Sequence, residues 1–339
     1  MLTKIEIKNY KSICNATIEL SPFTLLIGAN GAGKSNFIGL LKDLGEYWKS
    51  SQAAYQTLGS ISHAVRERFS HSSSFQKHFS HLIDEQGLTI ESDTKQKVSF
   101  VHDEKSPTRP LMYSEGGLFD LSEFSNICVF NIDPSSFGRS EPVINDPVVN
   151  EDGTGVTQVL DYLKTGDRED LFVAIENKLK DYVSEIEKLS FISEENSKKL
   201  QVREKYIPSP IPMKDLSEGT KFVLAILTIL HQENSPSLVC IEDIDRGFHP
   251  RLFQQIVELC HDLSRERGIQ IIATTHSPYI LDEFKGNESA VVIVEKKEGC
   301  TTFTTLAERL AQIEANGSED EMPLGSLWYS GLVGGVPKR

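Results

Sequence analysis

The sequence has 339 residues, of which 39% are hydrophobic and 25% charged, a composition typical of a globular protein with a sizeable core. Its length allows one large domain or two, and no apolar run reaches the length of a transmembrane helix. The formal net charge of −14 opposes a broad electrostatic grip on nucleic acid, although a local basic groove could survive it. No signal peptide marks the start, so we expect a cytoplasmic protein without a membrane partner.

The first part of the chain predicts three strands and a helix. Apolar and charged residues alternate over residues 2–8, the pattern of an edge strand, and Ile18 with Leu20 indicates a second strand. The apolar run Phe23–Ile27 predicts a short buried strand. Apolar residues then recur at helical spacing from Asn36 to Leu44, so that one short loop joins a buried strand to a helix.

That loop, Gly28–Ser35, fits G-x-x-x-x-G-K-[ST], the phosphate-binding P-loop. Its glycines let backbone N–H groups surround phosphates, and the N-terminus of the following helix adds the positive end of its dipole. We predict that Lys34 reaches the β- and γ-phosphates of ATP and that Ser35 binds Mg²⁺. The residues expected to hold the nucleotide here are Asn30, Gly31, Ala32, Gly33, Lys34, Ser35 and Asn36.

Residues 45–115 are the least regular part, and the function of residues 45–125 does not follow from the sequence. Residues 88–90 and 98–101 predict strands of a small antiparallel sheet, whereas 65–69 and 75–83 look partly helical.

The histidines and cysteines do not form a recognisable metal site. Four histidines in a Ser-rich stretch lack acidic or cysteine partners at ligand spacing, and we expect no structural zinc. Three of the five cysteines lie in apolar runs, and we expect buried free thiols in a reducing compartment. These residues are His63, His71, His78 and His81, and Cys14, Cys128, Cys240, Cys260 and Cys300.

The middle of the chain predicts a helical arm. A strand at Asn126–Ile132 comes before it. Apolar residues spaced by three and four from Leu171 to Leu189 predict an amphipathic helix, packed on a second helix around Glu194–Arg203. The charges of this arm are mixed, which argues against a basic stripe for nucleic acid. The proline-rich run 208–212 then acts as a stiff return.

A second helix N-terminus follows at Leu216–Thr220. Ser217 and Gly219 open a strongly apolar helix, and this pattern predicts an N-cap that can bind an anion. Taken alone it is an ordinary N-cap. Because a P-loop satisfies its own phosphates, the second site suggests a shared nucleotide.

Two more apolar strands end in polar residues. Ser237–Ile241 is followed by Glu242 and Asp243, adjacent carboxylates that repel each other unless a cation lies near them. We assign Glu242 to Mg²⁺ and Asp243 to the attacking water, with a solvated acidic turn as the alternative. Ile269–Thr275 ends at His276, on the ligand-binding edge of a parallel sheet, where it can bond the γ-phosphate or the water.

The motifs together resemble the ATP-binding-cassette (ABC) ATPase head of the SMC, RecF and OLD type. They occur in that family's order: Gly28–Ser35, Leu216–Thr220, Ile241–Asp243, His249–Pro250 and Thr275–Pro278. The opening Ile5–Ser12 looks like the family's first strand. The closing Leu324–Leu332 looks like the tail of small bacterial members, many of them encoded beside an effector in mobile or defence loci.

The resemblance implies an α/β P-loop fold: a mixed sheet flanked by helices, an antiparallel β subdomain and a short helical arm between the cassette halves. The expected parts are 1–135, 136–212 and 213–339. It also implies a homodimer or higher homo-oligomer, in which Lys34 of one subunit and Ser217 of the other hold each ATP.

The chain departs from the family pattern in two places. The order Glu242 then Asp243 puts an Asp, about 1.5 Å shorter than Glu, where water is activated, so we expect slow hydrolysis. No clear Q-loop glutamine is found, because Gln158 lies far along a loop-to-helix segment. The chain also lacks room for the nuclease domain of OLD proteins and for the long coiled coils of SMC proteins.

The leading functional hypothesis is an ATPase switch that dimerises around ATP and controls a separately encoded effector, such as a nuclease, in bacterial defence against phage or foreign DNA. One alternative is a RecF-like repair ATPase that binds DNA directly. Another is a slowly hydrolysing, ATP-locked scaffold, which Asp243 makes credible. A transporter ATPase subunit is disfavoured by Glu218 and by the form of the His249 and His276 motifs. The trigger and the effector do not follow from the sequence.

Overall fold

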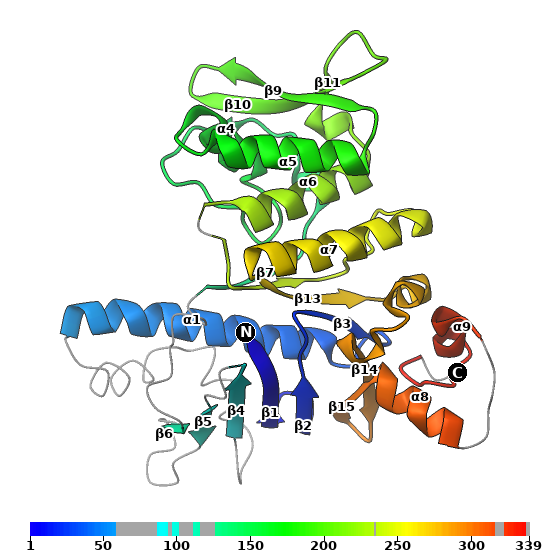
Figure 1. The fold of residues 1–339 in the computed structure, drawn as a ribbon. Helices are drawn as coiled ribbons and strands as arrows, with labels where there is room; N and C mark the ends of the chain where they lie inside the picture. Colours follow the sequence, from blue (N-terminus) through cyan, green and yellow to red (C-terminus); the bar gives the residue numbers. More distant parts are fainter. Residues whose placement is uncertain are drawn as a thin grey trace. The chain divides into compact units, whose positions relative to one another are not determined.

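The computed structural model describes residues 1–58, 87–93, 97–101, 111–115, 126–233, 235–315 and 322–336. The chain forms two compact units (Figure 1). Unit 1 comprises residues 1–128, 237–240 and 268–339, and unit 2 comprises residues 129–236 and 241–267. The helical expectation for 65–69 and 75–83 and the four histidines at 63, 71, 78 and 81 lie outside the described residues. The expected three-part division of the chain stays a prediction.

Unit 1 is organised around a six-stranded mixed sheet with the order β15-β14-β3-β13-β12-β7. Its strands are β3 (Phe23–Ile27), β7 (Ile127–Phe130), β12 (Leu238–Ile241), β13 (Gln270–Thr275), β14 (Val291–Lys297) and β15 (Cys300–Thr305). The last residues of β7 and β12 are counted with unit 2. Every residue of β3 is buried, as its continuous apolar run predicts, and β3 runs parallel to both β13 and β14.

Helix α1 (Lys34–Leu58) begins inside the P-loop and is longer than the sequence pattern predicts. Its apolar positions Leu40, Leu41 and Leu44 are completely buried, so the predicted face is the one that packs. Phe37 lies against Phe303 of β15 with ring centroids 5.6 Å apart, which ties the start of the helix to the sheet.

A second sheet of unit 1 is antiparallel and has the order β2-β1-β4-β5-β6. Its strands are β1 (Leu2–Tyr10), β2 (Ile13–Glu19), β4 (Gly87–Ser92), β5 (Lys97–Val101) and β6 (Leu111–Glu115). The strands predicted at 88–90 and 98–101 are confirmed as β4 and β5. The edge position predicted for the first strand is wrong, because β1 pairs with β2 on one side and β4 on the other. Its alternation instead reflects one buried face, which includes Ile5 and Ile7.

Unit 1 ends with 3₁₀ helices η5 (Pro278–Phe284) and η6 (Glu288–Ala290), helix α8 (Leu306–Ala315) and the short helix α9 (Leu324–Tyr329). None of the helices that the structure describes combines the length and apolar character needed to cross a membrane.

Unit 2 contains four helices, α4 (Val156–Thr165), α5 (Glu169–Tyr182), α6 (Glu218–His231) and α7 (Phe253–Arg267). Its small sheet joins β8 (Glu141–Pro142), β9 (Ile186–Glu194), β10 (Ser197–Glu204) and β11 (Ile211–Pro212), and three 3₁₀ turns are η2 (Pro134–Ser136), η3 (Met213–Asp215) and η4 (Pro250–Leu252). Helices α4 and α5 contact both the β9–β10 hairpin and α6, so they form the layer between them (Figure 1).

The amphipathic helix expected from Leu171 to Leu189 is confirmed as α5, but it ends at Tyr182. The second helix expected around Glu194–Arg203 is wrong, because this segment is the end of β9, the hairpin turn and β10. The pairing register shifts where Glu204 meets Ile186, while Arg203 meets Lys188. The shift leaves one extra residue in β9, and this bulge buries Ile186 and Leu189 together. Two apolar residues three positions apart therefore looked helical although they belong to a strand.

Candidate functional site

The P-loop turns sharply at two glycines in left-handed conformation, Gly31 at φ 74° and Gly33 at φ 117°. A Cβ atom on Gly33 would lie 2.2 Å from Thr301 Oγ1, and one on Gly28 would lie 2.2 Å from the carbonyl oxygen of Val294. The loop can therefore lie this close to β14 and β15 only with glycine at both positions.

Lys34 is 6% exposed, and its ammonium group lies inside the loop. The Nζ atom donates to the carbonyl oxygens of Gly28 at 2.6 Å and Ala29 at 3.2 Å. Lys34 Nζ also lies 3.4 Å from Nδ1 of the exposed His276. The sequence placed Lys34 and His276 at the same phosphate, and the structure brings these two side chains together.

Strand register explains this meeting. In the parallel pair β3 and β13, Ile27 lies opposite Thr275, so Gly28 and His276 leave the sheet side by side. In the parallel pair β3 and β14, Ile27 lies opposite Ile293, which brings the end of β14 to the same edge.

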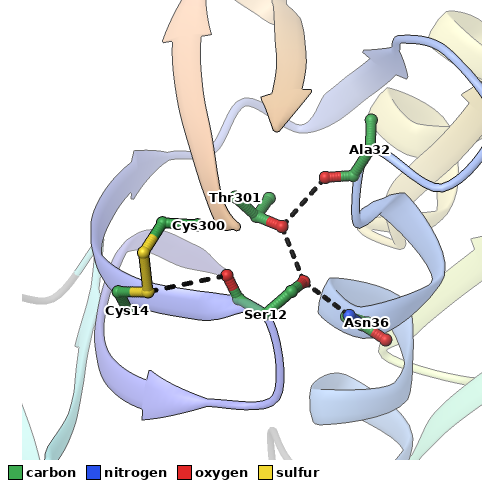
Figure 2. Close-up of a disulfide and its surroundings, with 6 residues drawn as sticks. All are labelled: Ser12, Cys14, Ala32, Asn36, Cys300 and Thr301. Atoms are coloured by element: carbon green, nitrogen blue, oxygen red, sulfur yellow. Dashed lines mark hydrogen bonds between the residues drawn. A yellow bond between two sulfur atoms is a disulfide. The ribbon is translucent and has the colours of Figure 1, made fainter. Parts of the chain in front are cut away.

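A chain of hydrogen bonds supports the loop from behind (Figure 2). Thr301 Oγ1 donates its one hydrogen to the carbonyl oxygen of Ala32 at 2.9 Å. In its second hydrogen bond, 2.6 Å long, Thr301 Oγ1 therefore accepts from Ser12 Oγ. Ser12 Oγ in turn accepts from Asn36 Nδ2 at 2.6 Å. Residues on β15 and on the β1–β2 turn thus hold the loop and the first turn of α1. Sequence reasoning missed Thr301, because it belongs to no motif.

The same region contains a disulfide between Cys14 and Cys300 (Figure 2). The expectation of free thiols is wrong for these two residues. The two cysteines are 286 residues apart, so no local pattern predicts the bond. The disulfide joins β2 to β15 next to Ser12 and Thr301. Cys240 and Cys260 are buried.

Next to the loop, unit 1 has a cavity of about 580 Å³. The P-loop, His276 and the end of β14 form part of its wall, and the C-terminal segment completes it. The lining residues are 29–32, His276, 294–297, Trp328, Gly335 and Val336. No pattern in the sequence indicates that the C-terminal residues lie beside the P-loop.

In unit 2, Ser217 is the N-cap of α6, as predicted. Its Oγ atom accepts from Thr220 N at 3.1 Å, and the side chain is exposed. A Cβ atom on Gly219 would lie 3.2 Å from the carbonyl oxygen of Gly247, so a larger residue would crowd this turn. Ser217, Gly219 and His249 line a cavity of about 550 Å³ at the N-terminus of the helix.

Glu242 and Asp243 follow directly after β12 and belong to unit 2. Both are partly exposed. The N–H of Glu242 donates to the carbonyl oxygen of Phe130 at 2.9 Å, which continues the pairing of β12 with β7 by one residue. Asp243 has φ 50°, a left-handed conformation that costs energy for a residue with a side chain. Their assigned roles, Mg²⁺ binding and water activation, stay predictions.

Two protein-family models match the sequence. The "AAA ATPase domain" model matches residues 1–115, which include the P-loop. The model described as "AAA domain, putative AbiEii toxin, Type IV TA system" matches residues 158–282, which include Ser217, Glu242, Asp243 and His276. Comparison with curated protein sequences finds no match.

Three solved structures of similar fold are SMC head domains. An Smc head bound to the C-terminal winged-helix domain of ScpA has a TM-score of 0.59 at 16% identity, covering 92% of this chain and 99% of that one. The SMC head domain from Thermotoga maritima has a TM-score of 0.52 at 13% identity, with 90% and 98% covered. The Smc head of Pyrococcus furiosus, bound to the C-terminal domain of ScpA, has a TM-score of 0.54 at 14% identity, with 94% and 99% covered.

This chain has the fold of an SMC-type ATPase head. It matches ATPase-domain models over residues 1–115 and 158–282, and its fold is the one seen in the SMC-type ATPase class. ATPases of this class use ATP with Mg²⁺, and the P-loop of this head fits a triphosphate: two left-handed glycines orient its N–H groups and Lys34 lies within it. Among the described residues, no group of three acidic, histidine or cysteine side chains could hold a metal ion by itself. Mg²⁺ bound through Ser35 would therefore need phosphate oxygens as further ligands.

Proposed function

We propose that this SMC-type head is an ATP-hydrolysing switch that dimerises around ATP and controls a separately encoded effector. The observation that carries the proposal is the exposed N-cap Ser217 at the start of the 14-residue helix α6. Its neighbouring cavity leaves room for an anion at the positive end of the helix dipole. A two-fold dimer would supply the phosphate, since each subunit then gives and receives the same contact.

In this proposal, Lys34 of one subunit and Ser217 of the other hold each ATP. Ser35 and Glu242 bind Mg²⁺, Asp243 orients the attacking water, and His276 contacts the γ-phosphate. Hydrolysis removes part of the interface and loosens the dimer, so the nucleotide state sets the assembly state by differential binding.

Control of a partner protein is supported by the matching family and by the similar structures. One matching family model is described as "AAA domain, putative AbiEii toxin, Type IV TA system". Two of the similar Smc heads are bound to a domain of ScpA, so heads of this fold bind partner proteins. We therefore infer a protein partner for this head. The proposed role in defence against phage or foreign DNA rests on the resemblance of the motifs and the tail to small bacterial members of the family.

A mixing experiment tests the shared site. Ser217→Arg leaves the P-loop intact but puts a bulky side chain at the facing phosphate, so we expect ATP binding without hydrolysis. Lys34→Ala should lose ATP binding. Mixed in equal amounts, the two inactive proteins should recover about a quarter of wild-type turnover, because half of the dimers are mixed and each has one intact site.

The matched control is Ser193→Arg, the same change at an exposed serine of β9, which should hydrolyse ATP normally. The shared site is wrong if Ser217→Arg alone keeps the normal rate. It is also wrong if the mixture stays inactive although size-exclusion chromatography with ATP shows mixed dimers.

A slowly hydrolysing scaffold is the second candidate. It is favoured by the short side chain of Asp243 and by the left-handed backbone conformation of this residue. A single-turnover measurement distinguishes the two. A scaffold retains the dimer long after ATP is added, whereas a switch releases it in each cycle. Direct binding of DNA, as in a RecF-like ATPase, would show as a DNA affinity that falls steeply between 50 and 200 mM salt.

A further inference from the structure

The C-terminal tail, residues 324–336, lies on the nucleotide edge of unit 1. Helix α9 packs on η5, and Gly325 N donates to Asp282 Oδ1 at 2.9 Å. A Cβ atom on Gly325 would lie 2.5 Å from the carbonyl oxygen of Pro278, two residues after His276. The tail is thus in direct contact with the segment that carries the predicted phosphate-binding histidine.

After α9 the tail turns through glycines in left-handed conformation and reaches the P-loop. Gly335 has φ 77°, and a Cβ atom there would lie 2.8 Å from Ile293 Cγ2, 3.0 Å from Trp328 Nε1 and 3.8 Å from Gly28 Cα. Only a glycine fits this space without displacing its neighbours. The first glycine of the P-loop therefore lies under the tail.

The carboxylate of Glu295 holds this turn in place. Its Oε1 atom accepts from Gly335 N at 3.1 Å, and its Oε2 atom pairs with Arg309 at 2.5 Å and with Lys297 at 3.0 Å. Burial alone would raise the pKa of Glu295, but the hydrogen bonds from Lys297 and Gly335 outweigh it and lower the pKa. Glu295 is therefore ionised at neutral pH and ties the tail to the end of β14.

Trp328 is the part of the tail that faces the site. It lines the 580 Å³ cavity together with P-loop residues 29–32 and His276. The side chain is 6% exposed, and its buried Nε1–H has no hydrogen-bond acceptor among the residues that the structure describes. A buried donor without an acceptor is costly, and a bound ligand or an ordered water beside it would remove that cost.

We infer that the tail is a wall of the ATP site, and that Trp328 and the Gly334–Gly335 turn respond to the terminal phosphate. The inference rests on the proposed ATP binding and extends it to the C-terminus. In this inference Trp328 lies on the γ-phosphate side of the ATP site, because it shares the cavity with His276 and the first half of the P-loop. The outer surface of the tail carries Tyr329 and Leu332, which are 79% and 53% exposed.

Tryptophan fluorescence tests this directly, because the chain has two tryptophans and Trp48→Phe leaves Trp328 as the only one. The variant is titrated with Mg²⁺ and either the β,γ-imido analogue of ATP or ADP, and equilibrium dialysis measures binding independently. We expect a saturable emission change with the analogue, at least about twice as large as with ADP, and at the dialysis Kd. Adding Lys34→Ala should abolish the change.

Three results would overturn the inference. If dialysis shows binding but the emission does not change, Trp328 does not line the ATP site. If the analogue and ADP cause equal changes, the tail does not respond to the γ-phosphate. No binding by dialysis overturns the proposed function as well, so failure of the tail and failure of ATP binding are distinguishable.

A pair of glycine variants tests the turn. Gly335→Ala and Gly286→Ala place alanine at φ 77° and φ 86°, but only the first has atoms within 4 Å of the new Cβ. We expect Gly335→Ala to raise the Kd for the ATP analogue about fivefold or more and Gly286→Ala to leave it within about twofold. Trp328→Phe keeps an aromatic side chain, although a smaller one, and removes the N–H, so it is measured as well in case Gly335→Ala does not fold. An unchanged Kd in every folded tail variant refutes the inference.

Discussion

Replacing Thr301 with valine tests the hydrogen bonds that hold the P-loop against β15. Thr301 is 1% exposed, and its Oγ1 atom bonds the carbonyl oxygen of Ala32 at 2.9 Å and Ser12 Oγ at 2.6 Å. Valine has nearly the same shape without the hydroxyl group, so the variant removes both bonds and opens almost no cavity.

The expected loss follows from the contacts. Two hydrogen bonds contribute about 1 kcal/mol each, and leaving the Ala32 carbonyl without this donor adds up to about 1 kcal/mol. We therefore expect Thr301→Val to lower the free energy of unfolding by about 2 to 3 kcal/mol. Because Ala32 belongs to the P-loop, a less firmly held loop should also raise the Kd for ATP by about fivefold.

Urea unfolding followed by circular dichroism measures the first effect, and equilibrium dialysis with ATP measures the second. The adjacent residue is a matched control: Thr302 Oγ1 is buried and has no hydrogen-bond partner among the described residues. Thr302→Val removes an unsatisfied hydroxyl group, so its stability should be unchanged or higher by about 1 kcal/mol. Equal losses in the two variants, or no loss in Thr301→Val, would refute the reasoning.

Three further predictions concern catalysis, the disulfide and pH. Asp243→Asn should trap ATP and Asp243→Glu should speed turnover, and unchanged steady-state rates in both would remove Asp243 from the mechanism. Cys14→Ser should lower the unfolding free energy of the oxidised protein by about 2 to 5 kcal/mol, because the bond with Cys300 closes a loop of 286 residues, and a dithiol reductant should make the wild type match the variant. Burial lowers the pKa of His231 to about 4, so the unfolded chain binds a proton that the folded chain does not. Stability should therefore fall by about 3 kcal/mol as the pH drops from about 6.5 to 4, and His231→Gln should flatten this dependence in urea titrations at each pH.

Local features of this protein follow from its sequence. The apolar run of β3, the glycine loop and the start of α1 are neighbours in the chain, so their pattern predicts a P-loop before any fold is known. The N-cap at Ser217 is equally local, because its hydroxyl group bonds a backbone N–H three residues ahead.

The helix expected from Leu171 to Leu189 shows the limit of such patterns. Helix α5 ends at Tyr182, and Ile186 and Leu189 belong to β9. Spacing of apolar residues indicates which side chains are buried together, and it does not distinguish a helix from a strand with a bulge. The pairing register of β9 and β10 decided the structure there, and register depends on both strands and on the helices that cover them.

The assembled site depended on tertiary structure for the same reason. Lys34 and His276 are 242 residues apart, and they meet because β3 and β13 are parallel neighbours in register. Thr301, Cys300 and Trp328 carry no motif, and they come to the P-loop only because β15 and the tail fold back beside it. The sequence by itself therefore determined which residue types could bind phosphate, since that chemistry lies in a few adjacent residues. Strand order and close packing between distant segments decided which other residues support and enclose them.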